Sequence, residues 1–179
     1  GQVESIRRAY EVGPQLSDLQ YVEAHSTATQ LGDATEVASL GEVLAGVVPA
    51  DRKLPVTSAK ANIGHALEAA GLASLVKVVL SMQHGTIPPA ANLEQLNPSI
   101  DWQSAPVYVP QAVTPWPAPG AGRPRTAGVN AFGIGGLNIH VALEAYNPAR
   151  PLPTIRPAVA RDPDDEAVAV IGRGCVFPD

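Results

Sequence analysis

Residues 19–36, LQYVEAHSTATQLGDATE, place a strand pattern, a polar loop and a helix pattern in direct succession. Residues 19–24 alternate between apolar and polar side chains, which predicts a β-strand. A short polar loop follows at residues 25–29. A helix is predicted to begin at Asp33, because Asp33 and Glu36 have the spacing of a capping box. The stretch is therefore typical of an α/β protein.

The same mixture of strands and helices continues on both sides of this stretch. A helix is predicted over residues 2–12, where Gly13-Pro14 ends it. Six prolines predict an extended surface segment over residues 106–124. Further strands are predicted at residues 54–58, 126–131 and 137–145. The polar loops that follow these strands are where α/β folds place their functional sites.

Residues 66–82 form the most apolar stretch and are predicted to be a nearly buried helix. Its polar residues Ser74, Lys77 and Ser81 fall at helical spacing and give one thin polar stripe. The stretch is too short to cross a bilayer comfortably, and charged residues interrupt it, so no membrane span is predicted.

The composition excludes several classes of protein. Hydrophobic residues make up 45% of the 179 residues, which excludes wholesale disorder. The formal charge of −5 and the absence of a basic stripe argue against a nucleic-acid partner. Cys175 is the single cysteine, so an internal disulfide is excluded and a cytoplasmic location is expected. The first ten residues lack the apolar run of a signal peptide, and the sequence is interpreted as a segment of a longer protein.

The sequence predicts three regions. Residues 1–146 carry the strand and helix patterns of one domain. Residues 147–165 are rich in proline and are interpreted as a linker. Residues 166–179 contain an apolar strand pattern, AVAVI, and are interpreted as the first strand of a second, truncated domain.

His25 and His65 are the first candidates for chemistry, since each follows a predicted strand and precedes a predicted helix. Two neutral imidazoles that donate to one oxygen would form an oxyanion or enolate site. Lys60 would then hold a nearby carboxylate or a water network. The alternative is that each histidine is a structural loop residue. His84 and His140 have no evident partners and are interpreted as structural, with His140 in a strand.

Other kinds of site have weaker support. A metal site would use His25, Asp33, Glu36 and His65, but their spacing is not a standard ligand set, and no metal is predicted. The glycine-rich turn at residues 132–136 leads into a strand, so pocket lining is favoured over phosphate binding. No G-x-S-x-G motif is present. The residues alone therefore predict an electrophile-stabilising half-site that lacks its nucleophile.

Three motifs resemble those of β-ketoacyl synthases. EAHSTATQLGD at residues 23–33 resembles their E-A-H-G-T-G-T-x-x-G-D motif. KANIGHALEAAG at residues 60–71 resembles K-x-N-I-G-H-x-x-x-A-A-G, and FGIGGLNIHV at residues 132–141 resembles F-G-x-G-G-T-N-x-H-V. The style is that of type I polyketide or polyunsaturated-fatty-acid synthases. Residues 167–178 resemble the opening of a second ketosynthase.

This resemblance implies a thiolase-like fold with layers in the order α-β-α-β-α, of which residues 1–146 would supply the C-terminal half only. The implied reaction is an acyl transfer, the decarboxylative Claisen condensation of an acyl thioester with malonyl-acyl carrier protein in polyketide or fatty acid biosynthesis. No cofactor would bind directly, because phosphopantetheine on the acyl carrier protein carries the substrates. The implied partners are that carrier protein, the N-terminal half of the ketosynthase and a second ketosynthase in a dimer.

The resemblance also assigns roles to single residues. His25 and His65 match the two catalytic histidines that stabilise the enolate, and Lys60 matches the active-site lysine. The positions implied to contact substrate or pantetheine are Thr27, Thr29, Ile134 and Gly135, with Ile134 at the place of a gating phenylalanine. The positions implied to support the site are Asp33, Glu36 and Asn62.

The sequence departs from the family pattern at several positions. Ser26 and Ala28 replace two glycines, so each adds a Cβ and restricts φ. The nucleophile motif T-A-C-S-S does not occur, and Cys175 does not match it. A non-elongating partner of the chain-length-factor kind is the alternative function, although the retained histidines and lysine favour an enzyme.

Overall fold

The computed structural model describes residues 1–49, 51–120, 122–133 and 135–148. The predicted second-domain strand, Cys175, Ile134 and nearly all of the predicted linker lie outside this part of the chain. The described part forms a compact unit over Gly1–Asn147.

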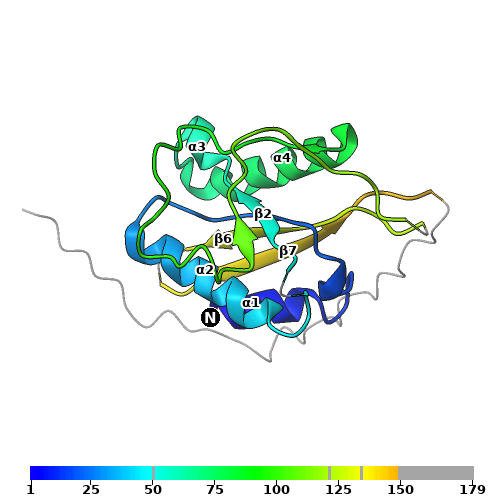
Figure 1. The fold of residues 1–179 in the computed structure, drawn as a ribbon, viewed down its shortest axis with the longest axis horizontal. Helices are drawn as coiled ribbons and strands as arrows, with labels where there is room; N and C mark the ends of the chain where they lie inside the picture. Colours follow the sequence, from blue (N-terminus) through cyan, green and yellow to red (C-terminus); the bar gives the residue numbers. More distant parts are fainter. Residues whose placement is uncertain (50, 121, 134, 149–179) are drawn as a thin grey trace, which may run out of the picture. The chain divides into compact units, whose positions relative to one another are not determined.

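A five-stranded sheet forms the centre of this unit (Figure 1). Its order is β4-β2-β1-β6-β7. All neighbouring strands are parallel except β6 and β7, which pair antiparallel. The strands are β1 (Tyr21–Glu23), β2 (Leu54–Thr57), β4 (Val107–Tyr108), β6 (Thr126–Phe132) and β7 (Asn138–Glu144). The predicted α/β class is therefore confirmed.

Helices cover both faces of this sheet, which gives three layers. Figure 1 shows α1 (Gln2–Ala9) and α2 (Gln30–Leu44) on one face and α3 (Lys60–Ile63) and α4 (Ala70–His84) on the other. The remaining elements are two 3₁₀ turns, η1 (Leu16–Asp18) and η2 (Leu67–Ala69), and a small antiparallel pair, β3 (Thr86–Ile87) with β5 (Thr114–Pro115). No helix of the described residues is both long enough and apolar enough to cross a membrane.

Each face of the sheet has its own apolar core. The core under α1 and α2 contains Ile6, Val22 and Leu40. The core under α4 contains Val78 and Val129, together with Tyr21 and Trp116, whose rings meet edge to face with 5.5 Å between centroids. Burial of apolar surface on both faces is the main force that holds the layers together.

The central strand β1 is shorter than predicted and is buried on both faces. All of Tyr21–Glu23 is buried, so the predicted alternation of an exposed and a buried face over residues 19–24 is wrong. The reason is the position of β1 between β2 and β6, with helices on both sides. Both neighbours of β1 follow it in the chain, β2 on one side and β6 on the other. In open α/β sheets, ligands bind at the carboxyl end of the strands at such a position.

The helix α2 begins earlier than predicted, and the capping box is wrong. It begins at Gln30 with Thr29 as its N-cap residue. Asp33 and Glu36 therefore lie within the helix, and Glu36 is 3% exposed. A carboxylate buried at that depth needs hydrogen-bond partners, and Glu36 finds them in the loop after β1 and in β6.

The helix α4 turns its polar stripe toward the sheet, beside the apolar Val78 and Met82, so the prediction of a nearly buried helix is wrong. Ser74 and Ser81 are buried, whereas Leu72 is 65% and Val76 is 57% exposed. The inward polar side is stable because Ser74 donates to the buried carboxylate of Glu23. Val79 and Leu80 extend the exposed apolar face. The helix begins at Ala70, after η2, rather than at residue 66.

Candidate active site

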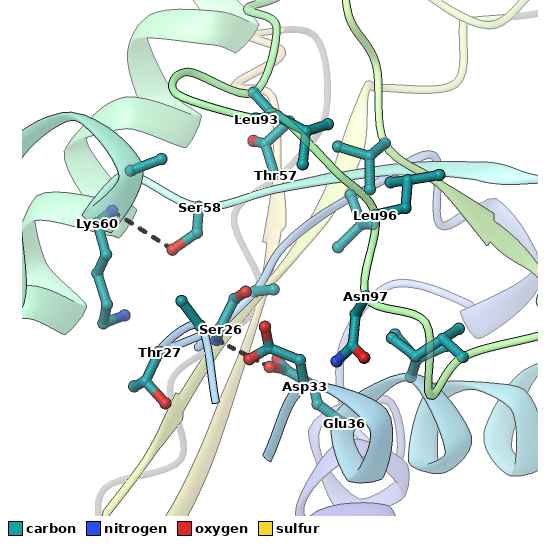
Figure 2. A pocket seen from close by; sticks show the side chains of 18 of the residues that line it. Ser26, Thr27, Asp33, Glu36, Thr57, Ser58, Lys60, Leu93, Leu96 and Asn97 are labelled. Carbon is teal, nitrogen blue, oxygen red and sulfur yellow. Dashed lines mark hydrogen bonds between the residues drawn. The ribbon is translucent and has the colours of Figure 1, made fainter. Parts of the chain in front are cut away.

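The loops after β1 and β2 meet at one edge of the sheet and line a cavity of about 700 Å³. Ser26 and Thr27 come from the loop after β1, whereas Lys60 and His65 come from α3 and the residue pair that follows it. Figure 2 shows Ser26, Thr27, Asp33 and Glu36 gathered on one side, with the Lys60 side chain extending toward this group from α3. The predicted polar loops therefore converge, as expected for parallel strands that end at the same edge.

The structure brings His25 and His65 together. Their ring centroids lie 5.7 Å apart and the rings are nearly perpendicular. Phe132 at the end of β6 also lies against His25, with 5.9 Å between ring centroids. Two rings at this separation can each direct an N–H toward a single oxygen bound between them.

The two histidines have different surroundings. His25 is half-buried, and its pKa is lowered to about 4, first by burial and then by the charges of Lys60 and His65. The imidazole of His25 is therefore neutral at pH 7. His65 is exposed, and its Nδ1 accepts the Leu67 N–H at 3.0 Å. A neutral His65 consequently carries its proton on Nε2 and can donate from there.

Glu36 fixes the loop that carries His25. Its Oε1 accepts the His25 N–H at 2.8 Å, and its Oε2 accepts the Ser26 N–H at 2.9 Å. Burial raises the pKa of Glu36, while these N–H donors and the side chain of Asn130 oppose the rise. A carboxylate on α2 therefore holds the backbone of a loop on β1 in place.

The loop after β1 has a backbone conformation that L-residues avoid. Ser26 has φ of 30° and Ala28 has φ of 62°. These are the two positions where the family pattern has glycine, which adopts positive φ without steric cost. Asp33 contributes to the loop as well: burial raises its pKa, while the backbones of Thr27 and Ala28 and the Ser26 side chain oppose the rise. The Glu36 contacts help to hold this strained loop.

The residue before Lys60 is bound to a second buried network, centred on Glu23, that the sequence did not predict. Glu23 is fully buried, and its Oε1 accepts the N–H of Ala59 at 2.5 Å, directly before Lys60. Its Oε2 pairs with Lys77 Nζ at 2.8 Å and accepts the Tyr21 hydroxyl at 2.6 Å. Burial lowers the pKa of Lys60, and the nearby charges of Glu23 and Glu36 oppose this. The sequence signal for this network was Glu23 itself, a carboxylate within a strand that is otherwise buried.

Not every residue of the predicted site reaches the cavity. Thr27 lines it, whereas Thr29 is exposed at the N-cap of α2. Asn62 is exposed on α3 and does not line the cavity. Gly135 is exposed in the turn before β7 with φ of 90°, a conformation suited to glycine. Among the described residues, no group of three or more histidine, cysteine or carboxylate side chains is arranged to hold a metal ion.

His140 has partners that were not evident from the sequence. It lies in β7, as predicted, and its Nδ1 is 2.5 Å from Asn130 Oδ1 on β6. Its Nε2 is 3.1 Å from the Tyr10 hydroxyl. Asn130 in turn donates to Glu36, so His140 belongs to the surroundings of the site.

Two protein families match successive parts of the chain. Residues 1–94 match the family "Beta-ketoacyl synthase, C-terminal domain". Residues 97–173 match the family "Ketoacyl-synthetase C-terminal extension". The second match begins after the Lys60–His65 region and includes β6 and β7.

Similar proteins are polyketide synthases. The chain is 44% identical over 162 residues to a phenolphthiocerol/phthiocerol polyketide synthase of Mycobacterium tuberculosis, and the alignment covers 89% of the chain and 8% of that protein. It is 41% identical to the 6-methylsalicylic acid synthase of Penicillium expansum, with coverage of 88% and 8%. The chain therefore spans less than a tenth of the length of these relatives.

Similar solved structures are ketosynthases. The oxazolomycin ketosynthase domain of Streptomyces albus superposes with a TM-score of 0.73 at 40% identity, over 84% of this chain and 26% of that one. The module 6 ketosynthase of the Bacillus subtilis bacillaene synthase gives a TM-score of 0.75 at 36% identity, over 82% and 26%. The thiolase-like fold is thereby confirmed. The chain belongs to the β-ketoacyl synthase family and corresponds to the C-terminal part of a ketosynthase of the type I polyketide synthase kind.

Proposed function

We propose that this chain forms the histidine and lysine half of a ketosynthase active site that performs decarboxylative Claisen condensation in polyketide biosynthesis. The supporting observation is the pair of His25 and His65, whose ring centroids lie 5.7 Å apart. His65 lines the cavity together with Lys60, and Ser26, the residue after His25, lines it as well. The malonyl unit would arrive on the phosphopantetheine of an acyl carrier protein. Thr27 lines the cavity, which supports the expectation that it contacts that arm.

The reaction has two stages, decarboxylation and then condensation, and the histidines act in the first. The bond between the malonyl α-carbon and its carboxylate breaks, CO₂ leaves, and the electron pair forms an enolate on the thioester. His25 and His65 each donate an N–H to the enolate oxygen, which stabilises the charge as it develops. The enolate carbon then attacks an acyl thioester on a cysteine supplied by the N-terminal half of the ketosynthase, and the thiolate leaves.

The lowered pKa of His25 suits this role. An imidazolium at His25 would repel the nearby Lys60 cation and would compete with Lys60 for the malonyl carboxylate. A neutral ring instead donates a hydrogen bond without transferring a proton. Lys60 adds positive charge beside the site, where it would attract the carboxylate of the incoming malonyl group.

The exposed face of α4 supports the proposal that the N-terminal half of the ketosynthase packs against this chain. Leu72, Val76, Val79 and Leu80 form an apolar surface that favours burial. The chain spans about a quarter of the length of the solved ketosynthases, so their other layers are available to cover this face. Dimerisation and the cytoplasmic location stay predictions.

Measurement of CO₂ release from malonyl-acyl carrier protein tests the proposed function in the ketosynthase that contains this chain. His65→Ala and His25→Ala should each lower kcat by about 10²–10³, the cost of removing one oxyanion donor. His84→Ala is the matched control, because His84 is exposed at the end of α4, outside the cavity lining, and should leave the rate unchanged. Rates within threefold of wild type for both site variants would refute the proposal.

A further inference from the structure

A buried chain of side chains connects the end of α1 to the loop that carries His25. It runs from Tyr10 to His140 at 3.1 Å, from His140 to Asn130 at 2.5 Å and from Asn130 to Glu36 at 2.8 Å. Glu36 then accepts the backbone N–H groups of the loop. The chain joins α1, β7, β6 and α2, and its three inner members are at most 8% exposed.

The hydrogen bonds of this chain all point the same way. Asn130 donates from Nδ2 to Glu36, so its Oδ1 is the acceptor that faces His140. His140 must then donate from Nδ1. Burial lowers the pKa of His140 to about 4, so the ring is neutral at pH 7 and its Nε2 accepts the Tyr10 hydroxyl. The tautomer of His140 is therefore fixed by its two neighbours.

The backbone of β6 makes room for this arrangement at Gly128. A Cβ added there would lie 2.5 Å from Cε1 of His140 and 3.2 Å from the Tyr10 oxygen. Glycine weakens the interior of a strand and often marks a close approach of another group. Asn130 and His140 are also direct cross-strand partners, so the two strands present both side chains at one level.

We propose that His140 is a positioning residue for the His25 loop, acting through Asn130 and Glu36. Its Nδ1–H holds the Asn130 amide in the orientation that donates to Glu36. Glu36 thereby keeps both oxygens aligned with the loop N–H groups, and Tyr10 selects the required tautomer. The expected effect on the rate rests on the proposed function. The expected effect on the order of the His25 loop is independent of it.

Two substitutions of His140 separate a hydrogen-bond role from a packing role. The amide of asparagine takes the place of Nδ1, whereas the amide of glutamine takes the place of Nε2. In the intact ketosynthase, His140→Gln should lower kcat for CO₂ release about tenfold with KM within twofold. His140→Asn should stay within about twofold of wild type. Equal losses in both variants, or no loss in either, would overturn the proposal.

Tyr10→Phe gives a second test that needs no change inside the sheet. It should lower kcat about threefold in the wild-type background, because His140 is then free to adopt the other tautomer. It should have no effect in the His140→Asn background, which has no Nε2 to receive the hydroxyl. An equal effect in both backgrounds would overturn the proposal, and this cycle decides the matter if His140→Gln does not fold.

Hydrogen exchange of the loop keeps the two proposals distinguishable. Amide exchange at residues 25–26, followed by mass spectrometry, should rise in His140→Gln and stay at the wild-type level in His140→Asn, whether or not the protein releases CO₂. A wild-type protein that releases no CO₂ but shows this pattern would refute the proposed function alone. An active wild type without the pattern would refute the positioning role alone.

Discussion

The two histidines of the site are held in opposite ways. His25 is half-buried, and a carboxylate from another element fixes the backbone of its loop through two N–H groups. His65 is exposed, and its ring is held by a contact to Leu67, two residues further on. The chain itself therefore preorganises the His25 side of the site. The exposed ring of His65 therefore depends more on what packs against it in the intact ketosynthase.

The largest expected effect concerns the exposed apolar face of α4. Val76→Lys should prevent folding of the intact ketosynthase, because burying an unpaired ammonium under the N-terminal half costs several kcal/mol. When this chain is expressed alone, we expect the wild-type form to aggregate. Val76→Lys should then raise its solubility. Soluble yield and size-exclusion chromatography of both forms measure the effect. An effect of the same sign in both forms would contradict the proposal that the N-terminal half of the ketosynthase packs on this face of α4.

Glu36 is the next most sensitive position. Glu36→Ala removes the acceptor of two loop N–H groups and of Asn130, so kcat should fall about 100-fold, equivalent to about 2.7 kcal/mol. Glu36→Gln keeps one carbonyl acceptor and should lose less. Glu42→Ala is the control, since Glu42 lies on the same helix in an exposed ion pair with Arg7. Turnover of Glu36→Ala within threefold of the control would remove the basis for a preorganised His25 loop.

The pH dependence of stability should report the buried histidine. The folded pKa of His140 is about 4, below the ordinary 6.5, so its contribution is complete above pH 6.5 and is lost as the pH falls toward 4. The stability advantage of wild type over His140→Asn should therefore shrink by about 1.4 kcal/mol between pH 7.5 and 5.5. Chemical denaturation at the two pH values measures it. Burial also raises the pKa of Glu36, but Glu36 is present in both proteins, so the comparison between them isolates His140.

The smallest expected effect comes from the strained loop. Ala28→Gly should stabilise the protein by about 0.5–1 kcal/mol, because relief of the strain at φ of 62° exceeds the added entropy of the unfolded chain. Ser26→Gly should gain less, since the Ser26 side chain also hydrogen-bonds Asp33. Thermal melts compare the two. A larger gain for Ser26→Gly would show that its hydroxyl contributes little.

The sequence predicted the class of fold and the convergence of His25, Lys60 and His65, because these follow from local patterns and from the rule that parallel strands end at one edge. It misjudged Glu36 as a cap, since the spacing of Asp33 and Glu36 fits a capping box and only the tertiary structure shows which groups a buried carboxylate meets. The inward polar face of α4 was missed for the same reason: the stripe that contains Ser74 faces Glu23, which lies 51 residues earlier in the chain.

The positions of His140 and Asn130 show a related limit. Both lie in strands whose existence was predicted, but their pairing depends on the register of β6 against β7, which local patterns did not define. Gly128 was not predicted to have a close neighbour, although a glycine inside a predicted strand is a signal of one, here His140.

The most direct measurement is a crystal structure of the intact ketosynthase with a non-hydrolysable malonyl-thioester analogue bound. We predict that a ring nitrogen of His25 and Nε2 of His65 both lie about 2.7–3.1 Å from the thioester oxygen, with Glu36 still bound to the loop N–H groups. A thioester oxygen held by other groups, with His25 and His65 more than about 4 Å away, would contradict the assignment of these histidines as the enolate-stabilising pair.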